Sequence, residues 1–111
     1  MARFVKGDVV VVPFPFSDLT LAKRRPALVL ASLEGDDRVL CQITSQQVRD
    51  RYSIEVDASD FASGSLKQRS SIRPNRLFTA DTHLILYQVG QLAPSKVDEV
   101  IERVVEILRR G

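Results

Sequence analysis

Short apolar runs separated by polar, glycine-containing stretches make up most of the chain. Residues 9–12 are four consecutive valines, too few for a helix, and Pro13 and Pro15 end the run. Residues 52–56 alternate Tyr, Ile and Val with Ser and Glu, which is typical of a half-buried strand. The apolar pattern predicts strands at residues 9–12, 25–31, 38–43, 52–56, 71–78 and 84–92.

Polar stretches between these runs predict the connections. Residues 34–37 (EGDD) predict a tight turn in which Gly35 supplies a positive φ. Gly90 is a candidate for a β-bulge inside the last strand. Longer, mostly irregular connections are predicted at residues 14–22, 46–52 and 59–67.

The C-terminal segment changes period. Its apolar residues recur at helical spacing, at Val97, Val100, Ile101, Val104, Val105 and Leu108. Pro94 precedes Ser95, and Ser95 with Asp98 resembles a capping box, so we predict a helix that starts there. One helix after six or so short strands predicts a mainly β fold, a small and strongly bent antiparallel sheet or barrel with the helix packed across it.

Length and composition fit one soluble domain. The 111 residues are enough for a single core, so residues 1–111 are expected to form one domain. Apolar residues make up 44% and charged residues 27%, and no run approaches the roughly 20 apolar residues that span a bilayer. Residues 1–6 lack the apolar stretch of a secretory signal. We expect a cytoplasmic protein without a membrane partner.

Residue counts exclude several kinds of site. The single Cys41 excludes an internal disulfide and a multi-cysteine zinc site, and it is expected to be a small core residue. His83 is the only histidine, which excludes a two-histidine acid–base pair within one chain, and we expect it on the surface before a strand. Asp36 and Asp37 lie in a turn without metal-ligating partners at useful spacing. No metal and no cofactor are predicted.

The distribution of charge is more informative than the net charge of +2. Lys23, Arg24 and Arg25 stand together at the start of an apolar strand, and burying three unpaired cations would cost several kcal/mol each. They must therefore face solvent or an anionic ligand. Residues 44–47 (TSQQ) follow the next apolar strand. If the two strands pair, a guanidinium and a hydroxyl group meet in one cleft, which suits a phosphodiester, and single-stranded RNA is the leading candidate.

Arginine and hydroxyl groups can support RNA cleavage without a metal. The attack of the RNA's own 2′-OH requires that the phosphorane be stabilised and that protons be moved. Arginine offers a planar fork of donors for phosphate oxygens, and a Ser or Thr hydroxyl adds one donor where charge develops. A general base of suitable pKa is missing from this set, so a slow or sequence-restricted nuclease is expected.

Four motifs occur in the order and at the approximate spacing of a known family. They are residues 7–10 (GDVV), 24–30 (RRPALVL), 43–46 (ITSQ) and 71–73 (SIR). The chain resembles the MazF/PemK (Kid) family of bacterial toxins over nearly its whole length. The resemblance implies an SH3-like barrel that forms a homodimer. It also implies a metal-independent endoribonuclease that cuts single-stranded mRNA at short motifs and leaves a 2′,3′-cyclic phosphate and a 5′-OH. A cognate antitoxin with an acidic tail is expected to fill the RNA groove and to link the toxin to operator DNA.

The resemblance also assigns roles to individual residues. Arg25 takes the place of the family's catalytic arginine, as proton donor and phosphate clamp, and Thr44 takes the place of the threonine that steadies the transition-state oxygens. The Arg-x-Asp pair of some members falls on Arg73 and Asn75, where the acid has become an amide that cannot serve as a base. Residues 16–23 match the family's mobile loop. The predicted substrate-binding residues are Asp18, Lys23, Arg24, Ser45, Gln46, Arg73 and Asn75.

Two other functions stay open at this point. The same barrel serves non-catalytic toxins that inhibit a protein target such as gyrase. These toxins depend on a C-terminal ending with tryptophan, and this chain has no tryptophan. An inactive nucleic-acid-binding barrel is the third reading. Arg25 and Thr44 favour the enzyme.

Overall fold

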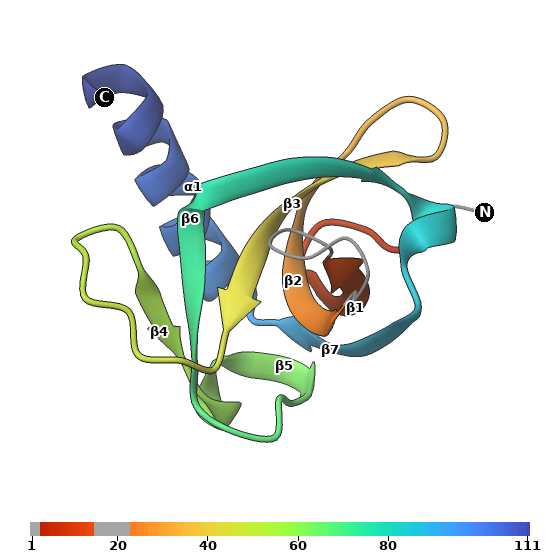
Figure 1. Ribbon diagram of the computed structural model, residues 1–111, viewed down its shortest axis with the longest axis horizontal. Helices are drawn as coiled ribbons and strands as arrows, with labels where there is room; N and C mark the ends of the chain where they lie inside the picture. The colour runs from red at the N-terminus through yellow and green to blue at the C-terminus, as the bar shows by residue number, and fades with distance from the viewer. Residues whose placement is uncertain (1–2, 15–22) are drawn as a thin grey trace.

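Seven antiparallel strands form one strongly curved sheet in the order β4-β6-β3-β2-β1-β7-β5 (Figure 1). The computed structural model describes residues 3–14 and 23–111. The elements are β1 (Asp8–Phe14), β2 (Lys23–Ser32), β3 (Asp37–Thr44), β4 (Ile54–Val56), the 3₁₀ turn η1 (Ala58–Asp60), β5 (Phe61–Gly64), β6 (Ser70–Asp81), the 3₁₀ turn η2 (Thr82–Leu84), β7 (Tyr87–Leu92) and the helix α1 (Pro94–Arg110). The predicted mainly β fold with one C-terminal helix is confirmed.

Burial on both faces explains the continuous valine run of β1. Val9 belongs to the larger core, whereas Val10 and Val12 belong to a second, smaller core on the opposite face. In β2, Leu28 and Ala27 divide between the two cores in the same way. Successive residues of a strand point to opposite faces, so a strand with apolar residues at every position is covered on both sides.

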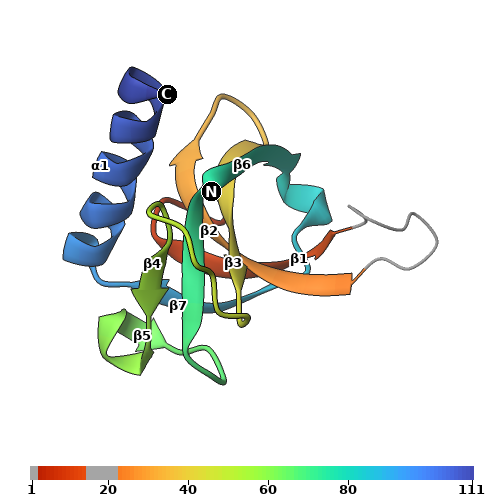
Figure 2. The same ribbon diagram turned by 60° about the vertical axis from the view of Figure 1, so that its left-hand side comes forward.

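The helix α1 closes the larger core. It lies along one side of the sheet (Figure 2), and Val97 and Val100 are buried there. The Nη1 atom of Arg103 donates to the carbonyl oxygens of Arg51 and Tyr52, each at 3.0 Å, and so ties the helix to the segment before β4.

The predicted capping box of this helix is wrong. The helix begins at Pro94, so its N-cap is Ala93, two residues before Ser95, and Ala93 makes no side-chain hydrogen bond. Proline suits the first turn because its missing N–H would have no partner inside the helix. A capping box does occur elsewhere, between Asp57 and Asp60 at η1.

Local turns agree with the sequence in part. Gly35 has a φ of +71° in the turn between β2 and β3, as predicted. A bulge interrupts the pairing of β1 with β7 next to Gly90, which is also confirmed. The last strand starts at Tyr87 and not at residue 84, because Asp81 caps η2 by accepting a hydrogen bond from the His83 amide at 2.8 Å. His83 is exposed ahead of that strand, as expected.

The prediction that residues 59–67 are mostly irregular is wrong, since they contain η1 and β5. β5 pairs with β7, and Gly64 lies directly opposite Gly90. The two glycines allow a backbone approach so close that a Cβ at Gly64 would lie 2.2 Å from the Val89 carbonyl oxygen. β5 itself is mostly exposed and shows no apolar alternation, so its sequence carries no strand pattern.

Two further expectations concern burial. Cys41 is fully buried in the larger core, and this burial raises the pKa of its thiol to about 12, although a backbone hydrogen bond with Leu28 acts in the other direction. The predicted core role of Cys41 is confirmed.

Within the described residues, no helix is long and apolar enough to cross a membrane.

Candidate functional site

A cleft of about 420 Å³ opens where β2 begins and β3 ends. Arg24, Arg25 and Pro26 of β2 form one part of its lining, and Thr44 and Ser45 at the end of β3 form another. The third part is the segment 65–68, which connects β5 to β6. The cleft thus joins residues about 20 and 40 positions apart in the sequence.

Strand register explains why Arg25 and Thr44 meet. Ala27 of β2 lies opposite Gln42 of β3, and the same antiparallel register continued by two residues sets Arg25 opposite Thr44. Residues that face each other across neighbouring strands lie on one face of the sheet. Arg24 and Arg25 are adjacent, so their side chains leave the strand on opposite faces. Both residues nevertheless line the cleft.

Thr44 is the more buried member of the pair, with 6% of its surface exposed. Its Oγ1 atom accepts a hydrogen bond from the Gln46 amide at 3.2 Å. A hydroxyl group has one donor hydrogen and two acceptor lone pairs, so this contact leaves the hydrogen of Thr44 available to a ligand. The bond also turns the chain at the end of β3, which carries Ser45 to the cleft.

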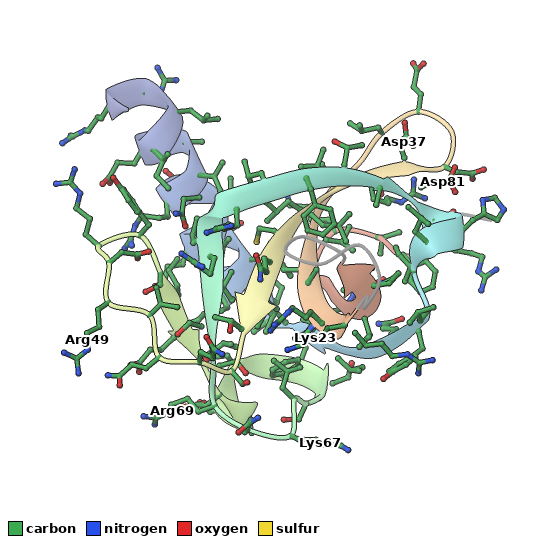
Figure 3. The ribbon with its side chains drawn as sticks, viewed as in Figure 1. Lys23, Asp37, Arg49, Lys67, Arg69 and Asp81 are labelled. Carbon is green, nitrogen blue, oxygen red and sulfur yellow. The ribbon has the colours of Figure 1, made fainter. Side chains whose placement is uncertain are left out.

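The cleft has a one-sided charge. Its described lining residues include three cations, Arg24, Arg25 and Lys67, and no Asp or Glu. Figure 3 shows Lys67 and Arg69 on the lower side of the molecule. Clefts lined by one sign of charge concentrate ligands of the opposite sign. The arrangement suits an anion with several oxygen atoms.

The structure brings part of the predicted set together. Arg24, Arg25, Thr44 and Ser45 all line the cleft, and Gln46 lines a second hollow that adjoins it. Lys23 is exposed at the first position of β2 and is not among the lining residues. Asp18 and most of the predicted loop at 16–23 lie outside the described residues.

Arg73 lies outside the cleft lining and has a carboxylate partner. Its Nη2 atom lies 3.6 Å from Oδ2 of Asp50, and both side chains are mostly buried. Its Nε atom is buried without a hydrogen-bond partner in the described part of the chain. Arg73 nevertheless shares a sheet face with Thr44, because Gln42 lies opposite Arg73 and Thr44 lies opposite Ser71.

Asp50 is held in place by the turn that it starts. Its Oδ1 atom accepts hydrogen bonds from the amides of Tyr52 at 2.9 Å and Ser53 at 2.8 Å. Partial burial raises the pKa of the Asp50 carboxyl, but these bonds and the charge of Arg73 outweigh it, so the pKa lies below its ordinary value. Asp50 is therefore ionised at neutral pH and a weak base.

Asn75 lies in an irregular part of β6. The pairing of β6 with β3 shifts between the pairs Cys41–Leu77 and Gln42–Arg73, so residues 74–76 bulge out of register. Asn75 is exposed in this bulge and is not among the residues that line the cleft.

The wall formed by residues 65–68 was missed from the sequence, and so was Ser70 beside it. The available signal was the pair of bases Lys67 and Arg69 behind Gly64, whose φ of +66° turns the chain toward the cleft. Asp50 was missed as well, since its partner Arg73 lies 23 positions further along the chain.

Asp36, Asp81 and His83 form a separate group at the other end of β6. Their ligand atoms lie within 4.8 Å of one another, so the expectation that Asp36 lacks partners is wrong. Figure 3 shows Asp37 and Asp81 at the end of the molecule opposite Lys67 and Arg69. The group is largely exposed and has no part in the cleft.

Comparison with known proteins supports the resemblance seen in the sequence. The sequence model of the family described as PemK-like, MazF-like toxin of type II toxin–antitoxin system matches residues 5–108. No curated protein sequence matches the chain.

Several solved structures share the fold. An endoribonuclease in complex with its cognate antitoxin, from a mycobacterial species, has a TM-score of 0.76 at 12% identity and covers 99% of this chain and 98% of its own. The Mycobacterium tuberculosis toxin MazF-mt6 has a TM-score of 0.72 at 18% identity, with 94% and 98% covered. A MazE–MazF structure from Deinococcus radiodurans has a TM-score of 0.75 at 18% identity, with 96% and 97% covered. At these identities the likeness establishes the fold.

Proposed function

The chain belongs to the PemK-like, MazF-like family of toxins from type II toxin–antitoxin systems, and on that premise we propose that it is an endoribonuclease that cuts single-stranded RNA. The observation that carries the proposal is the cleft in which Arg25 and Thr44 meet, with three cations and no acid among its described lining residues. A mycobacterial protein of the same fold is an endoribonuclease.

The proposed reaction uses the substrate's own nucleophile. The 2′-OH loses its proton to solvent water as its oxygen attacks the neighbouring phosphorus, a 2′-O–P bond forms, and the P–O5′ bond breaks. The products are a 2′,3′-cyclic phosphate and a 5′-OH. No proton acceptor is assigned among the residues of the cleft, which fits a slow or sequence-restricted enzyme.

Arg25 and Thr44 stabilise the charge that develops. The Arg25 guanidinium group matches two phosphate oxygens as a planar fork, and it donates the proton that the leaving 5′ oxygen takes up. The free hydroxyl hydrogen of Thr44 bonds a non-bridging oxygen, a contact of the kind that contributes roughly 3–4 kcal/mol in other enzymes. Arg24 and Ser45, together with Lys67, bind the flanking phosphates, and Lys23 and Gln46 extend that surface.

Neutralisation follows from the same charge. The mycobacterial endoribonuclease is in complex with its cognate antitoxin, and the Deinococcus radiodurans structure contains MazE with MazF. We propose that this chain also has a cognate antitoxin, whose acidic segment occupies the cleft and competes with RNA. Inhibition then weakens as salt rises.

A homodimer is the proposed assembly. Leu84, Leu86 and Tyr87 are between 45% and 54% exposed in one short stretch, and Tyr87 also lines the cleft. A two-fold interface over this stretch covers apolar surface and brings two clefts close together. Sedimentation at micromolar concentration is expected to give a dimer, and a monomer would contradict the assembly.

The decisive experiment compares single-stranded and duplex RNA in EDTA. The wild-type protein is expected to cut the single strand and to leave the duplex intact, because bases are read when they are unpaired. Thr44→Ala is expected to cut about 100-fold more slowly or worse. Thr79→Ala is the matched control, since Thr79 is an exposed threonine at the far end of β6.

Each adverse outcome has its own meaning. Loss of cleavage in chelator with recovery in magnesium would refute the mechanism. Equal rates for Thr44→Ala and Thr79→Ala would refute the site. Growth inhibition without any RNA cleavage would refute the nuclease function and favour a toxin that acts by binding a protein target.

A further inference from the structure

A second hollow of about 270 Å³ adjoins the basic cleft and shares Ser45 and Ser70 with it. The other residues that line this second hollow are Gln46, Gln47, Glu55, Arg69 and Ser71. Every one of these residues is polar, and none is aromatic. A ligand bound here is therefore recognised by hydrogen bonds at its edge and not by stacking.

Strand pairing sets the second hollow beside Thr44. Glu55 of β4 lies opposite Ser71 of β6, and Ser71 lies opposite Thr44 of β3. The three residues thus form one row on one face of the sheet. Neighbouring strands lie about 4.8 Å apart, so Glu55 is roughly 10 Å from Thr44 along this row.

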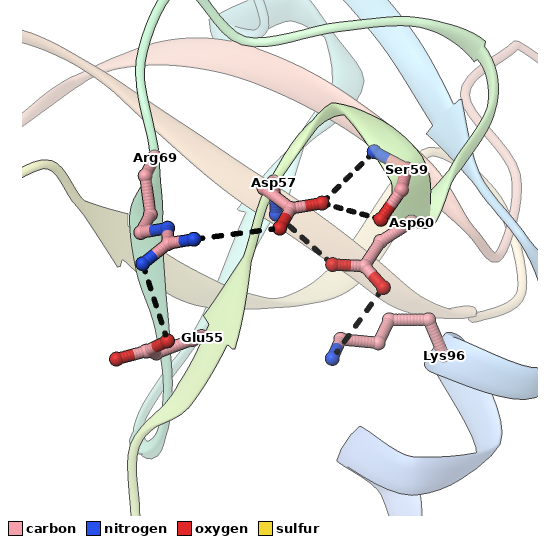
Figure 4. Close-up of polar contacts among 6 residues, drawn as sticks. All are labelled: Glu55, Asp57, Ser59, Asp60, Arg69 and Lys96. Atoms are coloured by element: carbon pink, nitrogen blue, oxygen red, sulfur yellow. Dashed lines mark hydrogen bonds and ion pairs between the residues drawn. The ribbon is translucent and has the colours of Figure 1, made fainter.

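The two charged residues of the second hollow already face each other. The Arg69 guanidinium lies 4.0 Å from the Glu55 carboxylate and 3.9 Å from the Asp57 carboxylate (Figure 4). Both separations are too long for good hydrogen bonds, and the side chains are largely exposed, so these pairs contribute little energy. Arg69 and Glu55 can therefore exchange this contact for a ligand.

Asp57 differs from Glu55 in having its own structural task. Its Oδ1 atom accepts hydrogen bonds from the Ser59 amide and hydroxyl, which hold its pKa below the ordinary value and cap η1. Asp57 does not line the second hollow. By contrast, the Glu55 carboxylate contacts Arg69 and forms no side-chain hydrogen bond with the described residues.

We propose that the second hollow binds one unpaired guanine next to the phosphate that is cut. The proposal rests on the function proposed above and adds a determinant of its specificity. The Watson–Crick edge of guanine carries two adjacent donors, N1–H and the N2 amino group, beside the acceptor O6. The Glu55 carboxylate accepts from the two donors, and Arg69 donates to O6, which is a frequent arginine–guanine contact. Gln46 and Gln47 line the same hollow and offer side-chain amides to the remaining edge.

Binding and cleavage test this proposal separately. The binding probes are uridine heptamers with a 2′-O-methyl group on every sugar, which removes the nucleophile. The central base is guanine, inosine, adenine, cytosine or uracil. The guanine heptamer is expected to bind about tenfold more tightly than the inosine heptamer, because inosine lacks the N2 amino group and so loses one hydrogen bond to a charged acceptor.

Matched variants assign the preference to the second hollow. Glu55→Gln keeps the size of the side chain and removes its charge, and it is expected to abolish the difference between guanine and inosine. Asp57→Asn removes the other carboxylate near Arg69 and keeps an acceptor for the Ser59 amide, and it is expected to preserve the difference. Equal binding of the two heptamers by the wild-type protein, or a difference that survives in Glu55→Gln, would overturn the proposal.

Cleavage of a random single-stranded RNA library distinguishes failure of the guanine-site proposal from failure of the proposed nuclease function. Guanine is expected at one fixed offset from the cut in the wild-type products and not in the Glu55→Gln products. Cuts without a guanine at a fixed position would refute the guanine site and leave the nuclease standing. An absence of cuts would refute the nuclease, and the heptamers would still decide whether the second hollow binds guanine.

Discussion

Gly64→Ala is expected to be one of the most destabilising single-methyl changes in this protein. Gly64 ends β5 at a φ of +66°, and a Cβ there would lie 2.2 Å from the Val89 carbonyl oxygen and 2.6 Å from the Gly90 Cα. Both atoms belong to the backbone of β7, so a side-chain rotation cannot relieve the overlap. β5 must separate from β7 or the glycine turn must open.

Gly35→Ala supplies the matched control. Gly35 has a similar φ of +71°, but a Cβ there would have no atom within 4 Å. The left-handed backbone alone costs an alanine about 1–2 kcal/mol. Overpacking adds about 1–3 kcal/mol at Gly64, so we expect losses in the free energy of unfolding of about 1 kcal/mol for Gly35→Ala and about 4 kcal/mol for Gly64→Ala.

Urea unfolding followed by far-ultraviolet circular dichroism measures both losses, because the chain has no tryptophan to report by fluorescence. The melting temperatures should fall by roughly 5 °C and 15 °C, respectively. Gly64 is followed directly by the residues 65–68 that line the cleft, so RNA cleavage should also fall in Gly64→Ala at temperatures where the variant is folded. Equal losses in the two variants would refute the argument from the β5–β7 approach.

Four further substitutions test other parts of the structure. Arg25→Lys should lower RNA cleavage about 100-fold with an unchanged circular dichroism spectrum, because a point charge does not replace the planar fork, and near-normal cleavage would remove Arg25 from the site. The pKa of Asp50 is lower in the folded than in the unfolded protein, so the ionised carboxylate stabilises the fold. This contribution is complete at pH values above the ordinary pKa of about 3.9, and it is lost as the pH falls through the lower pKa of the folded state. Asp50→Asn keeps an acceptor for the turn but removes the charge beside Arg73, so its unfolding free energy should vary less between pH 2 and pH 6, and an unchanged pH profile would contradict this. Val100→Ala should cost about 2 kcal/mol because Val100 is fully buried, whereas Val105→Ala should cost less than about 0.5 kcal/mol, and similar losses in urea unfolding would show that the helix packs differently.

The sequence by itself determined the elements whose signal is local. The valine run predicted the strand β1, and the helical spacing of Val97 and Val100 predicted α1 packed across the sheet. Gly35 predicted the tight turn. These predictions succeed because alternation, helical period and turn chemistry depend on residues within a few positions of one another.

Part of the candidate site was also readable in this way. Arg25 follows two other cations at the start of a strand, and Thr44 ends the next strand along the chain, so one hairpin brings them together. A hairpin is the shortest route between two strands, and its register follows from the turn and from the buried face. The cleft's second side could not be obtained by the same reasoning.

Only the tertiary structure decided what lies around that pair. β5 has no apolar alternation, and it exists because Gly64 and Gly90, 26 positions apart, let two backbones approach closely. The row from Glu55 through Ser71 to Thr44 depends on the register of three strands, which no local pattern specifies. A shift of one residue in any strand would turn its side chains to the other face, so the packing of the whole sheet determines which polar residues share the site.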